Sequence, residues 1–299
     1  MNPNDGRLPV PPRQPSYQDG PLQRRAFLRA VGALAAAWLV PASAAAQLEL
    51  QQAGALRIAV YADFPPYSTA GKGVDVDLGR ALAAELGLQA HIVEFVADED
   101  MNDDLRNMVW RGHYLGQRPA DVMLHVPVDK HFAARNDKVA IFGPYHLETM
   151  AMARHPERVP APSGSAASAF EVFTRERIGA ELDTHASDFL LHVLNGRLRD
   201  NVSHYRSVGE AMAALGRGEI AAVLGTRTQL EAARQHAPNA AVDPLAMPEM
   251  RVSGWPLGMA VKAEHRELAQ ALSGALARLQ RSGELARIFA AHGVTHRTP

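Results

Sequence analysis

The 299-residue sequence contains no cysteine and no apolar run long enough to cross a membrane. The missing cysteine excludes disulfides, thiol nucleophiles, thiolate metal sites and a lipidated N-terminal cysteine. The longest apolar run, residues 30–40, falls well short of the roughly 20 residues that a transmembrane helix needs. The formal net charge is only −1. This balance provides neither the basic surface typical of nucleic-acid binding nor a basic face for membrane adsorption.

The N-terminal segment has the three parts of an export signal. The pair Arg24 and Arg25 precedes the apolar residues 30–40, and a run of small residues ends at Ala46. This pattern predicts a cleavable signal peptide of the twin-arginine type, although the paired arginines alone do not exclude the general secretory route. We expect cleavage near residues 44–47, release into the periplasm and no membrane anchor.

The expected mature chain is weakly acidic and long enough for two lobes. Residues 1–46 begin with a polar, proline-rich stretch that predicts a disordered leader. Their removal takes away five arginines and two aspartates, which leaves 26 basic and 30 acidic residues, a formal charge of about −4. A chain of about 250 residues is close to the largest size that a single hydrophobic core supports, so we expect two lobes. Its partners should be small solutes or proteins, and no nucleic acid.

Strands and helices alternate through the first half of this chain. Apolar runs predict strands at residues 56–61, 91–96 and 121–126, and four-residue periodicity predicts helices at residues 74–86 and 104–111. This order indicates an α/β fold with mainly parallel sheets flanked by helices. Ligands of such folds bind beyond the carboxyl ends of the strands. The loops after these strands are therefore the first place to look for a site.

A second alternating unit follows a loop at residues 160–168. It comprises a strand at 177–182, a helix that begins near Thr184, a helix with the capping-box spacing Ser207 to Glu210, and a strand at 219–224. Leucines then repeat on one face from Leu268 to Leu279, and Gly283 separates this helix from a last one. The second unit predicts the second lobe.

The order of these segments resembles the family 3 extracellular solute-binding proteins, which have the type II periplasmic binding fold. Five stretches carry the resemblance: residues 56–67 (LRIAVYADFPPY), 73–83 (GVDVDLGRALA), 142–145 (FGPY), 218–224 (GEIAAVL) and 267–288. The resemblance spans nearly all of the expected mature chain. It implies two hinged lobes that close around a small molecule and present it to a membrane ABC permease, without chemistry and without a cofactor.

The resemblance also implies where the lobes divide. Residues 47–147 and 253–299 would form the first lobe, and residues 148–252 would be inserted as the second. Two crossing strands, near residues 148–154 and 254–262, would join them.

Two positions depart from the amino-acid-binding members of this family. Their arginine, which clamps the carboxylate of the ligand, aligns with Ala133 or Ala134, and Arg135 is displaced. Their aspartate, which holds the ammonium group, aligns with Gly225 or Thr226. Losing both opposite charges removes the electrostatic basis for binding a zwitterion. We therefore expect a small polar ligand other than a standard amino acid.

The candidate ligand site collects residues on the predicted loops and strand ends. These are Asp63, Phe64, Tyr67, Trp110, His125, Val126, Asp129, Tyr145, Asp183, Thr184, His185 and Thr226. The aromatic residues have the alternative of ordinary core packing, and Asp63 that of a local turn. His125 with Asp129 is the one pair in which a carboxylate would orient an imidazole. No two of His113, His125 and His185 have a metal-binding spacing, so we expect no metal. We also expect no catalytic residue.

Two other functions stay open from the sequence. The Val126-Pro127 strand end and the lost clamps are similar to a branch of the family that accompanies quinoprotein alcohol dehydrogenases in the periplasm, so the chain would serve a dehydrogenase partner. The fold also hosts dehydratases that act on cyclic dienyl acids. No nucleophile elbow, phosphate-binding loop or zinc-protease helix is present.

Overall fold

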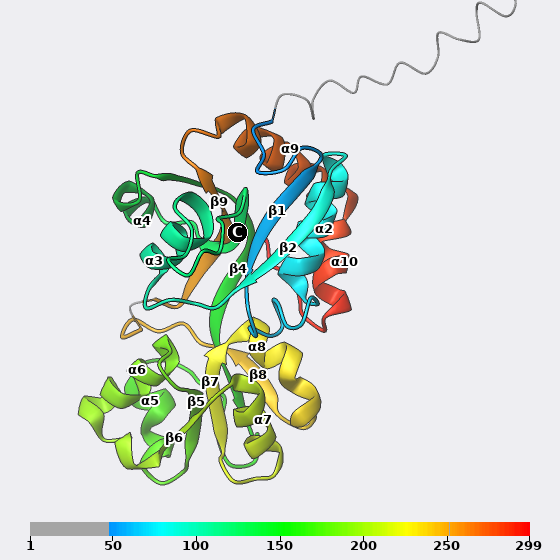
Figure 1. Ribbon diagram of the computed structural model, residues 1–299. Coiled ribbons are helices and arrows are strands. Elements are labelled where there is room, and N and C mark those ends of the chain that lie inside the picture. Colours follow the sequence, from blue (N-terminus) through cyan, green and yellow to red (C-terminus); the bar gives the residue numbers. More distant parts are fainter. Residues whose placement is uncertain (1–47, 251) are drawn as a thin grey trace, which may run out of the picture. The chain divides into compact units, whose positions relative to one another are not determined.

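The computed structural model describes residues 48–250 and 252–299 (Figure 1). The predicted leader, signal peptide and cleavage site lie outside these residues. Within them, no helix combines the length and apolar character that a membrane span requires.

The first and last parts of the described chain pack together, and we call this region lobe 1. Its elements are β1 (Ala55–Tyr61), α2 (Val74–Glu85), β2 (Gln89–Phe95), α3 (Met101–Leu105), a π-helical turn (Arg106–Trp110), β3 (Val122–Pro127), α4 (Lys130–Arg135), β9 (Gly254–Lys262), α9 (Arg266–Ser282) and α10 (Glu284–Ala291). The expected helix at residues 104–111 is thus a short α-helix followed by a π-helical turn.

The middle of the chain forms a second packed region, which we call lobe 2. Its elements are α5 (Ala166–Phe170), β5 (Ile178–Glu181), α6 (His185–His192), β6 (Val202–Tyr205), α7 (Val208–Gly216), β7 (Ala222–Thr226), α8 (Arg227–Ala232) and β8 (Ala241–Pro244), with single 3-10 turns at Glu171–Thr174, Val193–Gly196, Arg199–Asn201 and Ala233–His236. The strand expected at residues 219–224 begins later, at Ala222, because residues 217–221 form the turn after α7.

One long strand, β4 (Val139–Arg154), belongs to both regions (Figure 1). Its first part pairs with β9 as far as Thr149, and from Met150 onward it pairs with β7 and β8. The strand order is β2-β1-β3-β9-β4-β7-β5-β6, with β8 also on β4. In the described chain four strand pairings are parallel and four are antiparallel. The α/β class with helices flanking the sheet is confirmed. The sheet is mixed rather than mainly parallel, because β4 and β9 each run against their neighbours.

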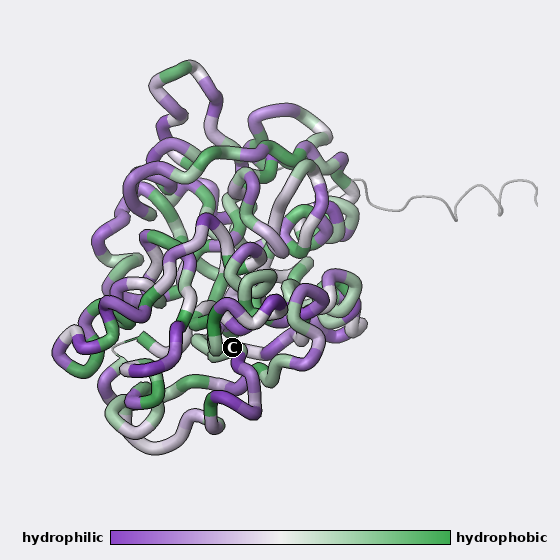
Figure 2. The backbone as a smooth tube through the Cα atoms, turned by 90° about the horizontal axis from the view of Figure 1, so that it is seen from below, coloured by the Kyte–Doolittle hydropathy of each residue, from purple (hydrophilic) through white to green (hydrophobic). Residues whose placement is uncertain are grey.

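The apolar side chains form separate cores on the two regions. In lobe 1, Leu78 and Leu82 of α2 and Leu272 and Leu276 of α9 are buried against β1 and β9. In lobe 2, residues such as Phe170, Leu190 and Leu224 fill a second core. Figure 2 shows short hydrophobic and hydrophilic segments that alternate along the described chain. The burial of the leucines of α2 and α9 is what their periodicity predicted.

The loop after β1 is held in place by its own backbone. The Phe64 amide donates to the carbonyl oxygen of Ser68 at 2.6 Å, and the Ser68 hydroxyl donates to the carbonyl oxygen of Tyr61. The amides of Val74 and Asp75, in the first turn of α2, donate back to this loop. A short loop with these contacts fixes the direction of the Phe64 side chain, which lies at the carboxyl end of β1.

Candidate functional site

Three neighbouring cavities lie at the carboxyl ends of the strands. The lobe 1 cavity, of about 500 Å³, is lined by residues of β1, β3 and β9 and by the segments that follow β1 and β2. The interlobe cavity, of about 270 Å³, is lined from both lobes. The rim cavity, of about 440 Å³, lies between the Asp63–Pro66 loop and the first turn of α7. Phe64 lines all three, so we treat them as one cleft.

Aromatic side chains form the lobe 1 wall of the cleft. The rings of Phe64 and His125 meet edge to face with centroids 5.0 Å apart, and Tyr67 stacks on Phe64 at 5.4 Å. Trp255 on β9 lines both the lobe 1 cavity and the interlobe cavity. It also packs against the cores of both lobes. Such a wall suits a solute with an apolar or cationic body.

His125 is held by Asp75, and the expected pairing with Asp129 was wrong. The Nδ1 atom of His125 lies 3.1 Å from a carboxylate oxygen of Asp75, and the hydroxyl of Tyr145 donates to the other oxygen at 2.8 Å. Asp129 instead accepts a hydrogen bond from the amide of Phe132 and caps α4. The sequence could not reveal this partner, because Asp75 comes from α2 while His125 lies on β3.

The lobe 2 wall is built from strand ends and helix caps. Thr184 caps α6 and Thr226 caps α8 through their side-chain oxygens. Both line the interlobe cavity, together with His185 and Glu181. The side-chain nitrogen of Gln229, Nε2, lies 3.5 Å from a carboxylate oxygen of Glu181. Burial raises the pKa of Glu181, although hydrogen bonds from the Val208 amide and Gln229 oppose that shift.

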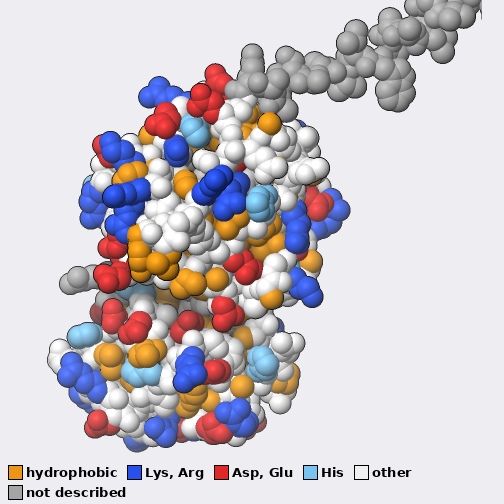
Figure 3. All heavy atoms as spheres, viewed as in Figure 1, with side chains coloured by type: hydrophobic (Ala, Val, Ile, Leu, Met, Phe, Trp, Pro, Cys, Tyr) orange, Lys and Arg blue, Asp and Glu red, His pale blue; other side chains and the backbone are white. Residues whose placement is uncertain are grey.

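Charge in the cleft is mostly negative. Among the described residues that line the lobe 1 and interlobe cavities, the acidic side chains are Asp63 and Glu181, and none is lysine or arginine. The rim cavity adds Glu210 and one cation, Arg206. Figure 3 shows acidic side chains along both margins of the groove between the lobes. Gly225 lines the interlobe cavity near the position where the amino-acid binders are expected to place an aspartate.

Several expected site residues do not line these cavities. Tyr67 is 1% exposed, and Tyr145 and Val126 are fully buried, so their predicted role as cleft walls does not fit their positions. Trp110 packs against the core beside β1 and β3. Asp183 is exposed, with a left-handed backbone that shapes the turn before α6.

Other lining residues were missed by the sequence reasoning. Glu181, Gln229 and Met150 line the interlobe cavity, and Leu257 lines the lobe 1 cavity. Glu181 had a usable signal, because it ends a predicted strand just before the Thr184 cap. Gln229 follows Thr226 by three residues, which places both on the first turn of α8.

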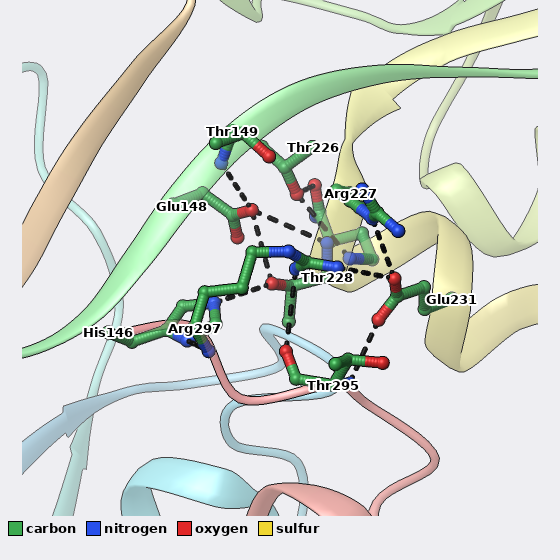
Figure 4. Close-up of polar contacts among 10 residues, drawn as sticks. His146, Glu148, Thr149, Thr226, Arg227, Thr228, Glu231, Thr295 and Arg297 are labelled. Atoms are coloured by element: carbon green, nitrogen blue, oxygen red, sulfur yellow. Dashed lines mark hydrogen bonds and ion pairs between the residues drawn. The ribbon is translucent and has the colours of Figure 1, made fainter. Parts of the chain in front are cut away.

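A buried polar network, which we call the Glu148 network, lies where β4 passes between the lobes (Figure 4). The Glu148 side chain is 1% exposed. It accepts hydrogen bonds from the Tyr67 hydroxyl at 2.5 Å, the Thr149 amide at 2.9 Å and the Thr228 hydroxyl at 3.1 Å. Burial and the adjacent Glu148 carboxylate raise the pKa of Tyr67, which keeps it a donor. The network joins the loop after β1 to the start of α8.

The same network extends to the C-terminal segment (Figure 4). The backbone amide of Arg297 donates to Nδ1 of His146 at 3.3 Å, and Nε2 of His146 lies 3.1 Å from the Thr228 hydroxyl. Arg297 also pairs with Glu231 at 2.7 Å. Burial, reinforced by nearby His296 and Arg297, lowers the pKa of His146 to about 3. His146 is therefore neutral in the folded protein.

No three histidine, aspartate or glutamate side chains in residues 48–250 and 252–299 converge as a metal site would require. The arrangement offers hydrogen bonds, aromatic faces and carboxylates around a solute-sized space. It can bind a small molecule.

Neither a family model nor a curated protein sequence matches this chain. Solved structures do match. One is an ancestral cationic amino acid solute-binding protein, with 19% identity, a TM-score of 0.61, and coverage of 80% of this chain and 96% of that chain. Another is a Streptococcus pneumoniae ABC-transporter substrate-binding protein bound to L-arginine, with 18% identity, a TM-score of 0.54 and coverage of 80% and 94%.

A third match is a mutant of the arginine-binding protein ArgBP from T. maritima, with 20% identity, a TM-score of 0.53 and coverage of 80% and 94%. These likenesses establish the fold: the chain has the α/β fold of the type II periplasmic binding proteins.

Proposed function

We propose that this chain is an exported solute-binding protein that captures a small polar molecule by lobe closure and presents it to a membrane importer. One observation carries the proposal: a cavity of about 270 Å³ takes its wall from both lobes, with Phe64 and Trp255 on one side and Thr184 and Thr226 on the other. A solute in that space touches both lobes at once. It therefore stabilises the arrangement in which the lobes are close.

Closure requires a hinge between the lobes, where a few residues can change their backbone angles without disturbing either core. β4 runs through both regions without a break, and its pairing partner changes from β9 to β7 between Thr149 and Met150. A change of partner within one strand is a place where a small backbone rotation alters the angle between two sheets. Glu148 and its donors sit at this position, so the Glu148 network would hold the loop after β1 near α8 during that rotation.

The structural neighbours support a non-enzymatic role. The Streptococcus pneumoniae protein is described as an ABC-transporter substrate-binding protein, which favours a permease as the partner of this chain. One ancestral neighbour is described as a precursor of cyclohexadienyl dehydratase. Since two of the other reported neighbours are described as a solute-binding protein and a substrate-binding protein, we propose binding without chemistry. No observation favours a quinoprotein dehydrogenase as the partner.

Tryptophan fluorescence and thermal melting test the proposal. We expect one member of a broad solute panel to change the emission of the full-length chain, because Trp255 lines the cavity. At about 100 times its Kd, that solute should raise the free energy of unfolding by about 2.7 kcal/mol. In the Trp255→Phe variant the melting shift should persist in part while the emission change is lost. If no solute shifts either signal, solute capture is not the function.

A further inference from the structure

The cleft has an imbalance of charge that bears on the class of ligand. In the described lining of the lobe 1 and interlobe cavities, Asp63 and Glu181 are the carboxylates, and the other titratable side chains there are Tyr61, His125 and His185. Arg206 lines only the rim cavity, where Asp63, Glu181 and Glu210 accompany it. A ligand carboxylate in the interlobe cavity would therefore face Glu181 without a neighbouring cation from the described lining.

Glu181 is the charged group at the centre of this arrangement. It ends β5 and lines both the interlobe and the rim cavity. Its hydrogen bonds come from the Val208 amide and from Gln229, and the latter contact is long at 3.5 Å. Two neutral donors satisfy only part of a carboxylate, which can accept about four hydrogen bonds. The remaining capacity points to a cationic donor on the ligand.

The apolar part of the cavity adds a second feature. Phe64 and Trp255 are the aromatic residues that line the interlobe cavity, and Met150, Val208 and Leu224 add further apolar side chains to its wall. Aromatic faces attract ammonium groups, and the attraction is stronger where water is excluded. A volume of about 270 Å³ limits the ligand to a small solute.

We propose that the cleft selects a small organic amine in its ammonium form, with no carboxylate of its own. Its nitrogen would lie against Glu181, and its body would lie between Phe64 and Trp255. Thr184 and Thr226 line the same space and offer hydroxyl oxygens to a hydroxyl or second amine on the ligand. This inference rests on the proposed solute-binding function and names the class of solute.

Matched pairs of probes test the inference, because each pair differs by one carboxylate. Isothermal titration of the full-length chain would compare ethanolamine with serine, putrescine with ornithine, and agmatine with arginine. We expect at least one amine to bind, with a Kd at least roughly tenfold lower than that of its carboxylate-bearing partner. Equal or tighter binding of the carboxylate member would overturn the inference and leave the proposed function standing.

A matched pair of variants tests the role of Glu181. Glu181→Gln keeps the shape of the side chain and removes its charge, so the Kd of the bound amine should rise by roughly 30-fold or more. Glu249→Gln changes an exposed glutamate of lobe 2 that lines none of the three cavities, and we expect an unchanged Kd. Amine binding that is insensitive to Glu181→Gln would overturn the inference.

The remaining outcomes separate the two proposals. If a neutral or anionic solute binds and none of the three amines does, the class of ligand is wrong and solute binding stands. If nothing in the panel binds, the proposed function fails and the inference falls with it. The comparison of matched probes needs no variant, so it holds even if Glu181→Gln does not fold.

Discussion

At the scale of single residues, burial decides which side chains belong to the site and which belong to the scaffold. Tyr67 follows the two prolines of an aromatic loop and was expected to wall the cleft, yet it is 1% exposed and donates to Glu148. Phe64, three residues earlier, lines all three cavities. The buried position suits Tyr67, because its ring packs in the core while its hydroxyl donates a hydrogen bond to the buried Glu148 carboxylate.

Tyr67→Phe removes this donor and leaves Glu148 buried with fewer hydrogen bonds. We expect the free energy of unfolding in urea to fall by about 1–3 kcal/mol, the usual penalty for an under-satisfied buried acceptor. Tyr114→Phe is the matched control, because Tyr114 is 85% exposed, and it should change stability by less than about 0.5 kcal/mol. An equal effect of the two variants would show that the Tyr67–Glu148 hydrogen bond contributes nothing.

At the scale of elements, the entry into α2 links the aromatic loop to the core. Gly73 adopts φ 133° just before α2, and a Cβ there would lie 2.2 Å from the carbonyl oxygen of Tyr67. The loop and the helix therefore approach each other as closely as backbone atoms allow. This approach fixes Asp75, which in turn holds His125 and Tyr145.

Gly73→Ala should destabilise the protein by about 2–4 kcal/mol, since it combines a strained φ with a backbone clash. Gly87→Ala is a suitable control: Gly87 has φ 69°, but its Cβ would meet nothing within 4 Å. The control should cost only the conformational part, about 1–2 kcal/mol. Chemical denaturation of both variants measures the difference, and a Gly73→Ala variant no less stable than the control would rule out the close approach.

At the scale of the whole described chain, the Glu148 network connects segments that are far apart in sequence. The Arg297 amide donates to Nδ1 of His146, so Nε2 carries the proton and donates to the Thr228 hydroxyl, which donates to Glu148. Every donor in this series has one acceptor. Protonation of Nδ1 would place two donors face to face, so the series requires a neutral His146.

This requirement predicts that stability falls in acid. The folded-state pKa of His146 is lowered to about 3, against an ordinary value of 6.5, so between these pH values the unfolded state binds one more proton than the folded state. The free energy of unfolding therefore decreases as pH falls from about 6.5 toward 3, by up to roughly 1.4 kcal/mol per pH unit from this group. Above about pH 6.5 the contribution of His146 to the free energy of unfolding is fully present.

His146→Gln should weaken that dependence. Urea unfolding at pH 7, 6, 5 and 4 would show a slope smaller than that of the unmodified chain by about 1 kcal/mol per pH unit. His131→Gln changes an exposed histidine and should leave the slope unchanged. Parallel slopes for His146→Gln and the unmodified chain would mean that other groups cause the acid sensitivity.

Local sequence patterns predicted many of the elements. The strands β1, β2, β3 and β5 and the helices α2, α7, α9 and α10 lie within a few residues of their predicted positions. The Ser207 cap and the helix break at Gly283 are as predicted, and the structure adds that Gly283 has a left-handed backbone. The family resemblance placed a crossing strand near residues 148–154, whereas β4 already begins at Val139. A register shift between Phe142 and His146 accommodates Gly143 and Pro144 within it. The lobe boundaries and the cleavage site remain predictions.

The sequence by itself determined the fold class, since periodicity and capping depend on residues close together in the chain. It also predicted that Phe64, Thr184 and Thr226 lie at strand or helix ends. Only the tertiary structure decided that Glu181 shares a cavity with Trp255, that Asp75 holds His125, and that Glu148 is buried. Each of these depends on which strands become neighbours, and that choice is made by packing two whole cores, which no local pattern encodes.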